Sequence, residues 1–130
     1  MKKLLGIAAV LLMIVSCSKK ESELNGREYQ LINAMNNAEI TLSFDQDGNR
    51  YFGSAVNRYF GTYKLDGNKI SFGPAGATMM MGPEPLMEAE TNYLQILPKV
   101  QSYHFDGDNL ILVTDNNQEL AFKYLGNIQK

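Results

Sequence analysis

Few side chains in this protein have the types and spacing that catalysis or metal binding requires. Its 130 residues include one cysteine and one histidine. Cys17 follows the apolar run of residues 4–15, and His104 lies between two aromatic residues in a segment that alternates like a strand. A structural zinc site takes about four such ligands, and a catalytic Cys–His pair needs both groups side by side. We therefore expect no metal site, and we expect His104 to face solvent rather than to act as a base.

Carboxylates are the next candidates. Glu84 and Glu88 are four residues apart on an expected helix and so share one face, and Glu90 follows on the same helix. Paired carboxylates can support hydrolysis, but three helical glutamates are more typical of a solvated face. The acidic turn 45–49 lacks the distal glutamate of a calcium loop, and the sequence shows no phosphate-binding glycine motif or Ser–His–Asp set. We expect no catalytic residue and no cofactor.

The charge balance excludes a further class of function. The chain has 12 Lys and Arg against 14 Asp and Glu, a formal net charge of −2. A general nucleic-acid binder needs a basic face, which this sequence does not offer. The 45% hydrophobic and 20% charged composition also excludes a wholly disordered, collagenous or coiled-coil chain, and the length fits one domain.

Three consecutive methionines, Met79, Met80 and Met81, are unusual. In an extended segment they cannot all face inward, so we expect at least one to be exposed. The simplest interpretation is that the methionines fill a loop and part of the core, under one end of the β-barrel that the rest of the sequence predicts. Methionine also suits adaptable binding surfaces and binds Cu(I) through its thioether, so a hydrophobic contact, a ligand entrance or copper capture remain alternatives. Tyr59 and Tyr93 are candidates for the same ligand or contact surface, because they combine aromatic bulk with a polar tip.

The N-terminus has the pattern of a secretory signal. Lys2 and Lys3 precede an apolar run too short to span a bilayer, and the run ends in Ile-Val-Ser before Cys17. This ending resembles a bacterial lipobox, which implies cleavage before Cys17 and lipidation of its thiol. We expect residues 1–16 to be the signal peptide and residues 17–26 to be a lipidated cysteine with a flexible tether. Ser18, rather than Asp, favours the outer membrane, so the expected location is the bacterial cell envelope, with the membrane reached through the lipid anchor.

The rest of the chain, residues 27–130, is expected to form one mainly β domain. Alternating residues predict about eight strands, separated by Asp- and Gly-containing turns. The expected strands are residues 27–33, 39–44, 49–56, 59–65, 69–73, 101–106, 109–114 and 119–125. A helical period over residues 84–97, bounded by prolines, predicts one helix, with Leu86, Tyr93, Leu94 and Leu97 facing the sheet. Eight antiparallel strands suit a small closed barrel, with the helix covering one end.

Three motifs then resemble those of META domains, the family that includes HslJ-like heat-shock proteins. They are the Gly53–Tyr63 segment, the Thr78–Pro83 segment and the helical segment Glu90–Leu94, and the final hairpin, Tyr103 to Phe122, also fits the family pattern. The resemblance covers about residues 24–125. It implies a small lipocalin-like antiparallel barrel with one helix, in an envelope protein without established enzymatic activity or an agreed ligand.

The resemblance also singles out individual positions. The family-motif residues, with a structural or binding role, are Gly53, Asn57, Gly61, Tyr63, Thr78 and Met80. Many members carry two motif cysteines, and Val56 and Gly82 stand at these positions here. If the cysteines pair in relatives, that link is absent from this chain. From the residues themselves we interpret Asn57 as a structural turn residue, with a binding role as the alternative.

These observations predict a non-enzymatic cell-envelope lipoprotein. We expect it to act through contacts with an unidentified envelope protein, in envelope maintenance or stress response. The alternative is a barrel that binds a small apolar ligand or lipid.

Overall fold

The computed structural model describes residues 23–128, so the predicted signal peptide, Cys17 and residues 18–22 lie outside the described residues. The strands are β1 (Arg27–Leu31), β2 (Thr41–Phe44), β3 (Arg50–Ser54), β4 (Arg58–Asp66), β5 (Lys69–Phe72), β6 (Gly76–Ala77), β7 (Val100–Asp106), β8 (Asn109–Thr114) and β9 (Glu119–Asn127). The helices are the 3-10 helix η2 (Met35–Asn37), the α-helix α2 (Glu84–Ile96) and the 3-10 helix η3 (Leu97–Lys99).

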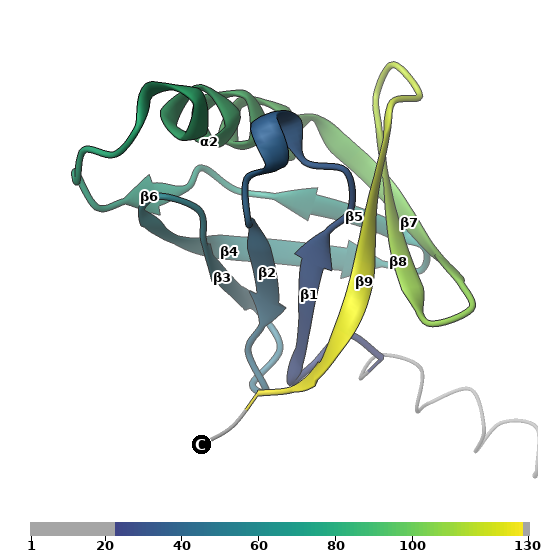
Figure 1. Ribbon diagram of the computed structural model, residues 1–130. Coiled ribbons are helices and arrows are strands. Elements are labelled where there is room, and N and C mark those ends of the chain that lie inside the picture. Colours follow the sequence, from purple (N-terminus) through teal and green to yellow (C-terminus); the bar gives the residue numbers. More distant parts are fainter. Residues whose placement is uncertain (1–22, 129–130) are drawn as a thin grey trace, which may run out of the picture.

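Eight of these strands form a closed antiparallel barrel (Figure 1). Neighbours follow the order β3-β2-β1-β9-β8-β7-β5-β4, and pairing of β3 with β4 closes the circle. The nine residues of β4 pair on one side with β6 through Tyr59 and Phe60 and with β5 further along. The expected eight-stranded barrel is confirmed. β6 and η2 were not expected, because two or three residues are too short to show a period.

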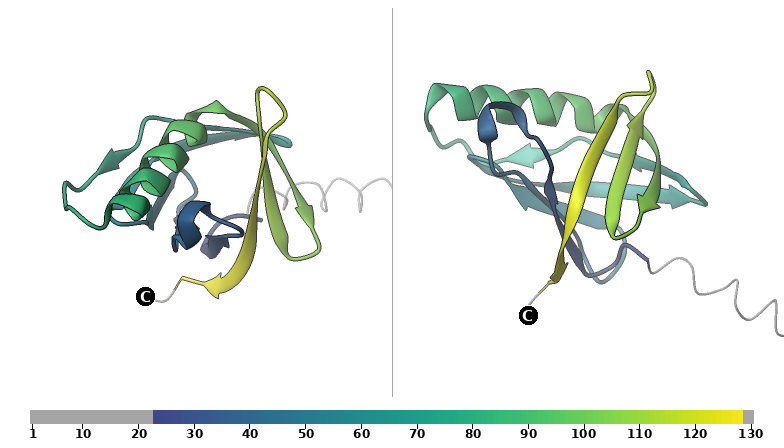
Figure 2. Two further views of the ribbon diagram at one scale, coloured as in Figure 1. Left: turned by 45° about the horizontal axis from the view of Figure 1, so that its top comes forward. Right: turned by 45° about the vertical axis from the view of Figure 1, so that its right-hand side comes forward.

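Helix α2 lies across one end of the barrel, as expected (Figure 2). It gives way to η3, which contains Pro98, because proline lacks the amide N–H that a continuing helix needs. Tyr93 and Leu97 are buried against the barrel, while Leu86 and Leu94 are half-buried. The predicted packing face is therefore confirmed for Tyr93, Leu94 and Leu97, whereas Leu86 is not among the residues packed on the core. Ala89 and Glu90, which the prediction left out, are buried.

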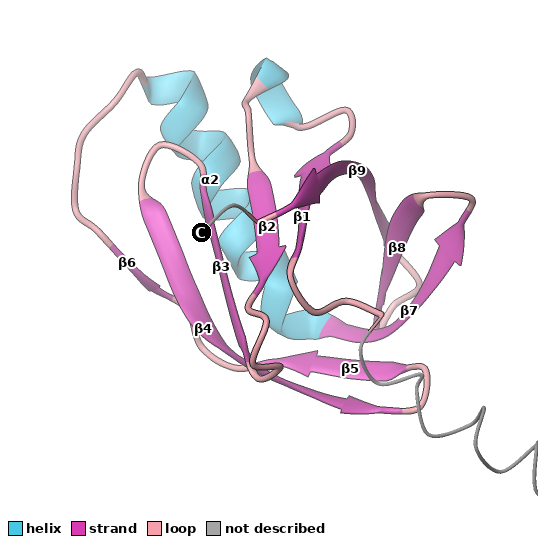
Figure 3. Ribbon diagram, turned by 90° about the horizontal axis from the view of Figure 1, so that it is seen from below, coloured by secondary structure: helices cyan, strands magenta, loops and turns pink. Residues whose placement is uncertain are grey.

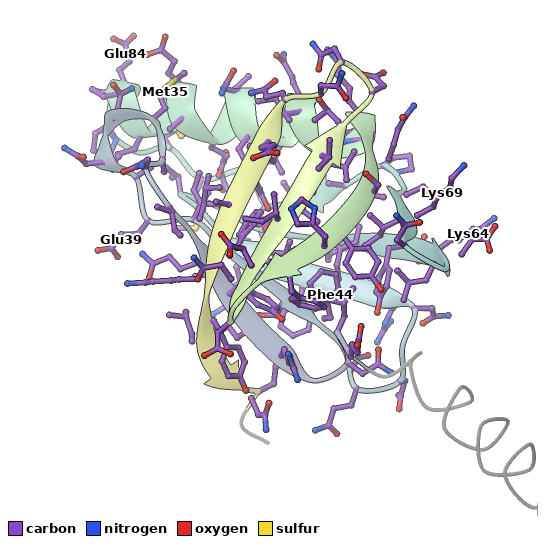
Figure 4. All side chains as sticks on the ribbon, turned by 90° about the vertical axis from the view of Figure 1, so that its right-hand side faces the viewer. Met35, Glu39, Phe44, Lys64, Lys69 and Glu84 are labelled. Carbon is purple, nitrogen blue, oxygen red and sulfur yellow. The ribbon has the colours of Figure 1, made fainter. Side chains whose placement is uncertain are left out.

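The barrel interior is filled with aromatic side chains. The buried rings are those of Tyr29, Phe44, Tyr51, Tyr59, Tyr63, Phe72, Tyr93, Tyr103 and Phe122. Several meet edge to face, with ring centroids 5.1 Å apart for both Phe44–Tyr63 and Tyr51–Phe72. In Figure 4, Phe44 lies among the strands and Lys64 and Lys69 point out from the β4–β5 hairpin. Such packing makes the interior a core rather than an open chamber.

The opposite end of the barrel is closed by the segment that precedes β1 (Figure 3). Leu24 is fully buried in the core, and the Gly26 amide donates to the Phe44 carbonyl oxygen at 2.8 Å. The expectation that residues 24–26 belong to a flexible tether is therefore wrong. One apolar residue in a polar segment gives no period, so its burial could not be derived from the sequence.

Candidate functional site

Asn57 is the centre of a buried polar cluster at the helix-covered end of the barrel. It lies in the turn between β3 and β4 and is 4% exposed. Its backbone amide and its Nδ2 donate to the two carboxylate oxygens of Glu90 on α2, at 2.6 and 2.9 Å. The turn expected at Asn57 is confirmed, and it is joined to the helix by both donors.

The other side of Asn57 is joined to the segment after β6. Its Oδ1 accepts hydrogen bonds from the Thr78 hydroxyl at 2.9 Å and from the Met80 amide at 2.6 Å. Its Nδ2 also donates to the Met80 carbonyl oxygen at 3.3 Å. Asn57, Thr78 and Met80, three of the predicted motif residues, thus meet at one point. Together with Glu90 they join the β3–β4 turn, the segment after β6 and helix α2.

The burial of Glu90 shows that one prediction about the helix is wrong. Glu90 was expected on a solvated helix face with Glu84 and Glu88, which are exposed, but it is 6% exposed. Its position three residues before the buried Tyr93 placed it on the apolar side of the helix, and this signal was available in the sequence. A carboxylate tolerates such burial when donors surround it, and the donors come from Asn57.

Gly53 and Gly61 make room for two tyrosine rings. On the paired strands β3 and β4, Gly53 lies opposite Tyr59 and Gly61 lies opposite Tyr51. A methyl group on either glycine would come within 2.6 Å of the opposing tyrosine hydroxyl. Each ring therefore lies across the glycine of the neighbouring strand, an arrangement that supports glycine in a sheet. This gives both motif glycines a packing role.

Tyr59 and Tyr93 form a buried hydroxyl pair, 2.7 Å apart. The Tyr59 hydroxyl donates to the Thr41 carbonyl oxygen, so the Tyr93 hydroxyl is the donor to Tyr59. Burial, together with the neighbouring Tyr93, raises the pKa of Tyr59 well above its ordinary value. Because these tyrosines are 1% and 2% exposed, their expected place on a contact surface is wrong and they belong to the core.

Tyr63 lies apart from this cluster, at the end of the barrel that Leu24 closes. Its hydroxyl donates to Asn25 Oδ1 at 3.3 Å. Burial, with smaller contributions from Tyr103 and Asp45, raises the pKa of Tyr63 to about 12. The motif residue Tyr63 therefore also has a structural role, because it links β4 to the N-terminal segment.

The methionine loop, Met79–Met81, lies on the surface. The three side chains are 94%, 63% and 90% exposed, so the expectation that the loop fills the core is wrong. Only the backbone of Met80 is engaged in the Asn57 cluster. The cluster therefore holds the loop in place while its thioether side chains remain in solvent.

Within residues 23–128 no three His, Cys, Asp or Glu side chains are grouped closely enough to hold a metal ion. His104 is exposed, as expected, and lies on the wall of an open depression of about 1080 Å³ with Tyr63 and Tyr103. In the Asn57 cluster, the side-chain groups are bonded to one another and to backbone, which makes the cluster a structural joint.

The sequence of the domain matches a known family model. The model of the META domain matches residues 21–125. This chain belongs to the META domain family. Comparison with curated proteins finds no match.

Solved structures share the fold of this META domain. A protein from Burkholderia xenovorans, solved by NMR, superposes with a TM-score of 0.66 at 28% identity, over 78% of this chain and 83% of that chain. A second NMR structure gives 0.61 at 20% identity, over 80% and 93%. A DUF4847 family protein from Bacteroides vulgatus ATCC 8482, a crystal structure, gives 0.50 at 19% identity, over 70% and 61%.

Val56 and Gly82 touch: a Cβ added at Gly82 would lie 3.8 Å from the Val56 Cβ. The two positions at which the motif resemblance implies cysteines in other members of the family are therefore neighbours here. Among residues 23–128, no helix has the length and apolar character needed to cross a membrane.

Proposed function

We propose that this META domain protein is a non-enzymatic lipoprotein of the bacterial cell envelope that acts by binding another protein. The lipid on Cys17 holds it on a membrane, most simply the outer membrane. The methionine loop makes the contact with the partner, in envelope maintenance or stress response.

The exposure of the methionine loop is the observation that carries this proposal. The three consecutive methionine side chains are 94%, 63% and 90% exposed, and a contiguous group of exposed apolar side chains is typical of a protein contact site. Methionine is flexible and polarisable, which suits a surface that must adapt to a partner. The Asn57 cluster fixes the loop backbone, so that little of its order has to be created on binding.

The filled interior disfavours the alternative, a barrel that binds a small apolar ligand. Nine aromatic rings occupy the core, and rings such as Tyr51 and Phe72 are in edge-to-face contact. An interior ligand would have to displace them. Native mass spectrometry of the domain, secreted without Cys17, tests this point: a stoichiometric bound small molecule would favour the ligand-binding barrel.

Lipidation is tested by labelling cells with an alkyne analogue of palmitate. The full chain should take up the label and partition with membranes, and Cys17→Ser should lose both properties. Equal labelling of the two proteins, or none of either, contradicts the anchor.

The partner contact is tested by photo-crosslinking in the cells that produce the protein. Benzoylphenylalanine at Met81 should give a protein adduct of one discrete size, whereas the same probe at the exposed Lys123 on β9 should not. An absence of protein adducts at Met81 contradicts the proposed function.

A further inference from the structure

The outer face of β3 and β4 carries two exposed aromatic rings directly opposite each other. Phe52 and Phe60 are cross-strand partners and are 39% and 56% exposed. Alternate residues of a strand share a face, so Arg50, Arg58 and Lys64 project on the same side as the two rings. We call these five residues the phenylalanine face. The remaining outward positions of the two strands are Ser54, Thr62 and, at the end of β4 away from β6, Asp66.

The phenylalanine face is cationic, whereas the described domain as a whole is acidic. Residues 23–128 contain seven Lys and Arg against 13 Asp and Glu. Arg50 is weakly paired, with its Nε 3.8 Å from Asp45, whereas Arg58 and Lys64 have no ion-pair partner among the described residues. Exposed aromatic rings bordered by arginine are typical of protein interfaces, and the free cations suit a partner that carries carboxylates.

The phenylalanine face is continuous with the methionine loop. Gly76 on β6 lies opposite Phe60, and a methyl group on Gly76 would come within 2.9 Å of the Phe60 ring. The ring therefore covers the glycine and extends towards β6. Two residues further on, the Thr78 amide donates to the Arg58 carbonyl oxygen at 3.0 Å, which brings the start of the methionine loop beside Arg58.

The outer edge of β6 is free to accept another strand. β6 ends the strand order and pairs only with β4 among the described strands. The Thr78 amide points towards β4, so the alternation of an antiparallel strand turns the N–H and C=O of Ala77 away from it. An extended segment can add to such an edge through backbone hydrogen bonds.

We propose that the phenylalanine face, the methionine loop and the β6 edge together bind an extended segment of another protein that carries both apolar and acidic side chains. The apolar side chains pack on Phe60 and the methionines, and the carboxylates meet Arg58 and Lys64. This inference rests on the proposed function and adds the chemistry of the partner to it.

The position of the methionine loop and the number of cations favour a protein over the anchoring membrane. The loop between β6 and α2 lies at the far left of Figure 1, and the described chain begins at the lower right, on the other flank of the barrel. Residues 17–22 reach about 20 Å when extended, whereas a domain of this size is about 35 Å across. The methionine loop therefore lies away from the lipid, although Lys64 lines a depression with Glu23 and Asn25 near the start of the described chain. The three cations of the surface are fewer than the four to eight of a typical lipid-binding cluster.

The test is photo-crosslinking from position 60 of the full-length chain, in the cells that produce it. Benzoylphenylalanine replaces Phe60, and the control carries it at Leu125, which is 45% exposed on β9. We expect a protein adduct from position 60 whose joined peptide, identified by mass spectrometry, contains Asp or Glu among apolar residues. Arg58→Glu should lower the adduct yield by about tenfold, since like charges would then face each other. Lys123→Glu, the same charge change on β9, should leave the yield unchanged.

Several results would overturn the inference. They are a lipid adduct from position 60, a joined peptide without acidic residues, or an adduct whose yield Arg58→Glu does not lower. No protein adduct from position 60, with a protein adduct from Met81, would remove this surface and leave the proposed function standing. No protein adduct from either position 60 or Met81 would remove both.

Discussion

Replacement of Asn57 by alanine should show how much of the domain's stability depends on the polar cluster. The change removes four side-chain hydrogen bonds: two to Met80, one to Thr78 and one to the Glu90 carboxylate. A neutral hydrogen bond contributes about 1 kcal/mol and one to a charged group about 2 kcal/mol. Water can replace part of this at Thr78 and Met80, because both residues are exposed. We expect Asn57→Ala to lower the free energy of unfolding by about 4 kcal/mol.

The assay is urea unfolding followed by circular dichroism, with thermal unfolding as a second measurement. For a domain of this size the loss corresponds to roughly 15 °C in Tm. Asn92→Ala on the exposed side of α2 is the matched control and should change the free energy of unfolding by less than about 0.5 kcal/mol. Hydrogen exchange of the Met80 amide should accelerate in Asn57→Ala only. A loss no larger than that of the control would refute the role of the cluster as a structural joint.

Three other variants test separate parts of the fold. The double variant Val56→Cys, Gly82→Cys should form a disulfide, because the Cβ atoms would lie 3.8 Å apart. Closing this loop should raise the free energy of unfolding by about 3.5 kcal/mol in the chain-entropy treatment. A free-thiol assay and unfolding with and without reductant measure the effect, and two free thiols would show the geometry to be wrong. Leu24→Ala should lower the free energy of unfolding in urea by about 3 kcal/mol, whereas Leu125→Ala, at an exposed site, should lower it little. Equal effects of the two variants would show that Leu24 is not part of the core. The pKa of Tyr63 is raised to about 12 in the folded domain from an ordinary value of 10.0. Its contribution to stability is therefore complete below pH 10 and is lost as the pH rises to about 12. Tyr63→Phe should flatten this part of the stability–pH curve, and an unchanged slope would contradict the assignment.

The strand pattern was predictable because it depends on neighbouring residues. Alternation in residues 109–114 predicts β8 with its observed bounds, and the prolines around residues 84–97 bracket α2. Turns rich in Asp and Gly separate the strands. These are local effects of backbone geometry and side-chain period, so a single sequence carries them.

The candidate site was predictable only in part. The motif resemblance brought Asn57, Thr78 and Met80 forward, but not the hydrogen bonds that join them. Glu90 was assigned to the solvated face because glutamate is most often exposed, although its helical position pointed inward. The contacts that keep it buried come from residue 57, which is 33 positions away. Such distant pairings cannot be derived from periodicity.

The sequence by itself determined the family, the mainly β barrel and the helix over one end, because these follow from motifs, strand period and turn residues. Only the tertiary structure decided which side chains are buried and which are available. It buried Tyr59, Tyr93 and Leu24, exposed the methionine loop and aligned Phe52 with Phe60 across two strands. The physical reason is that burial is settled by the whole packed chain: barrel closure brings distant residues into register, and a side chain's own polarity only biases the outcome.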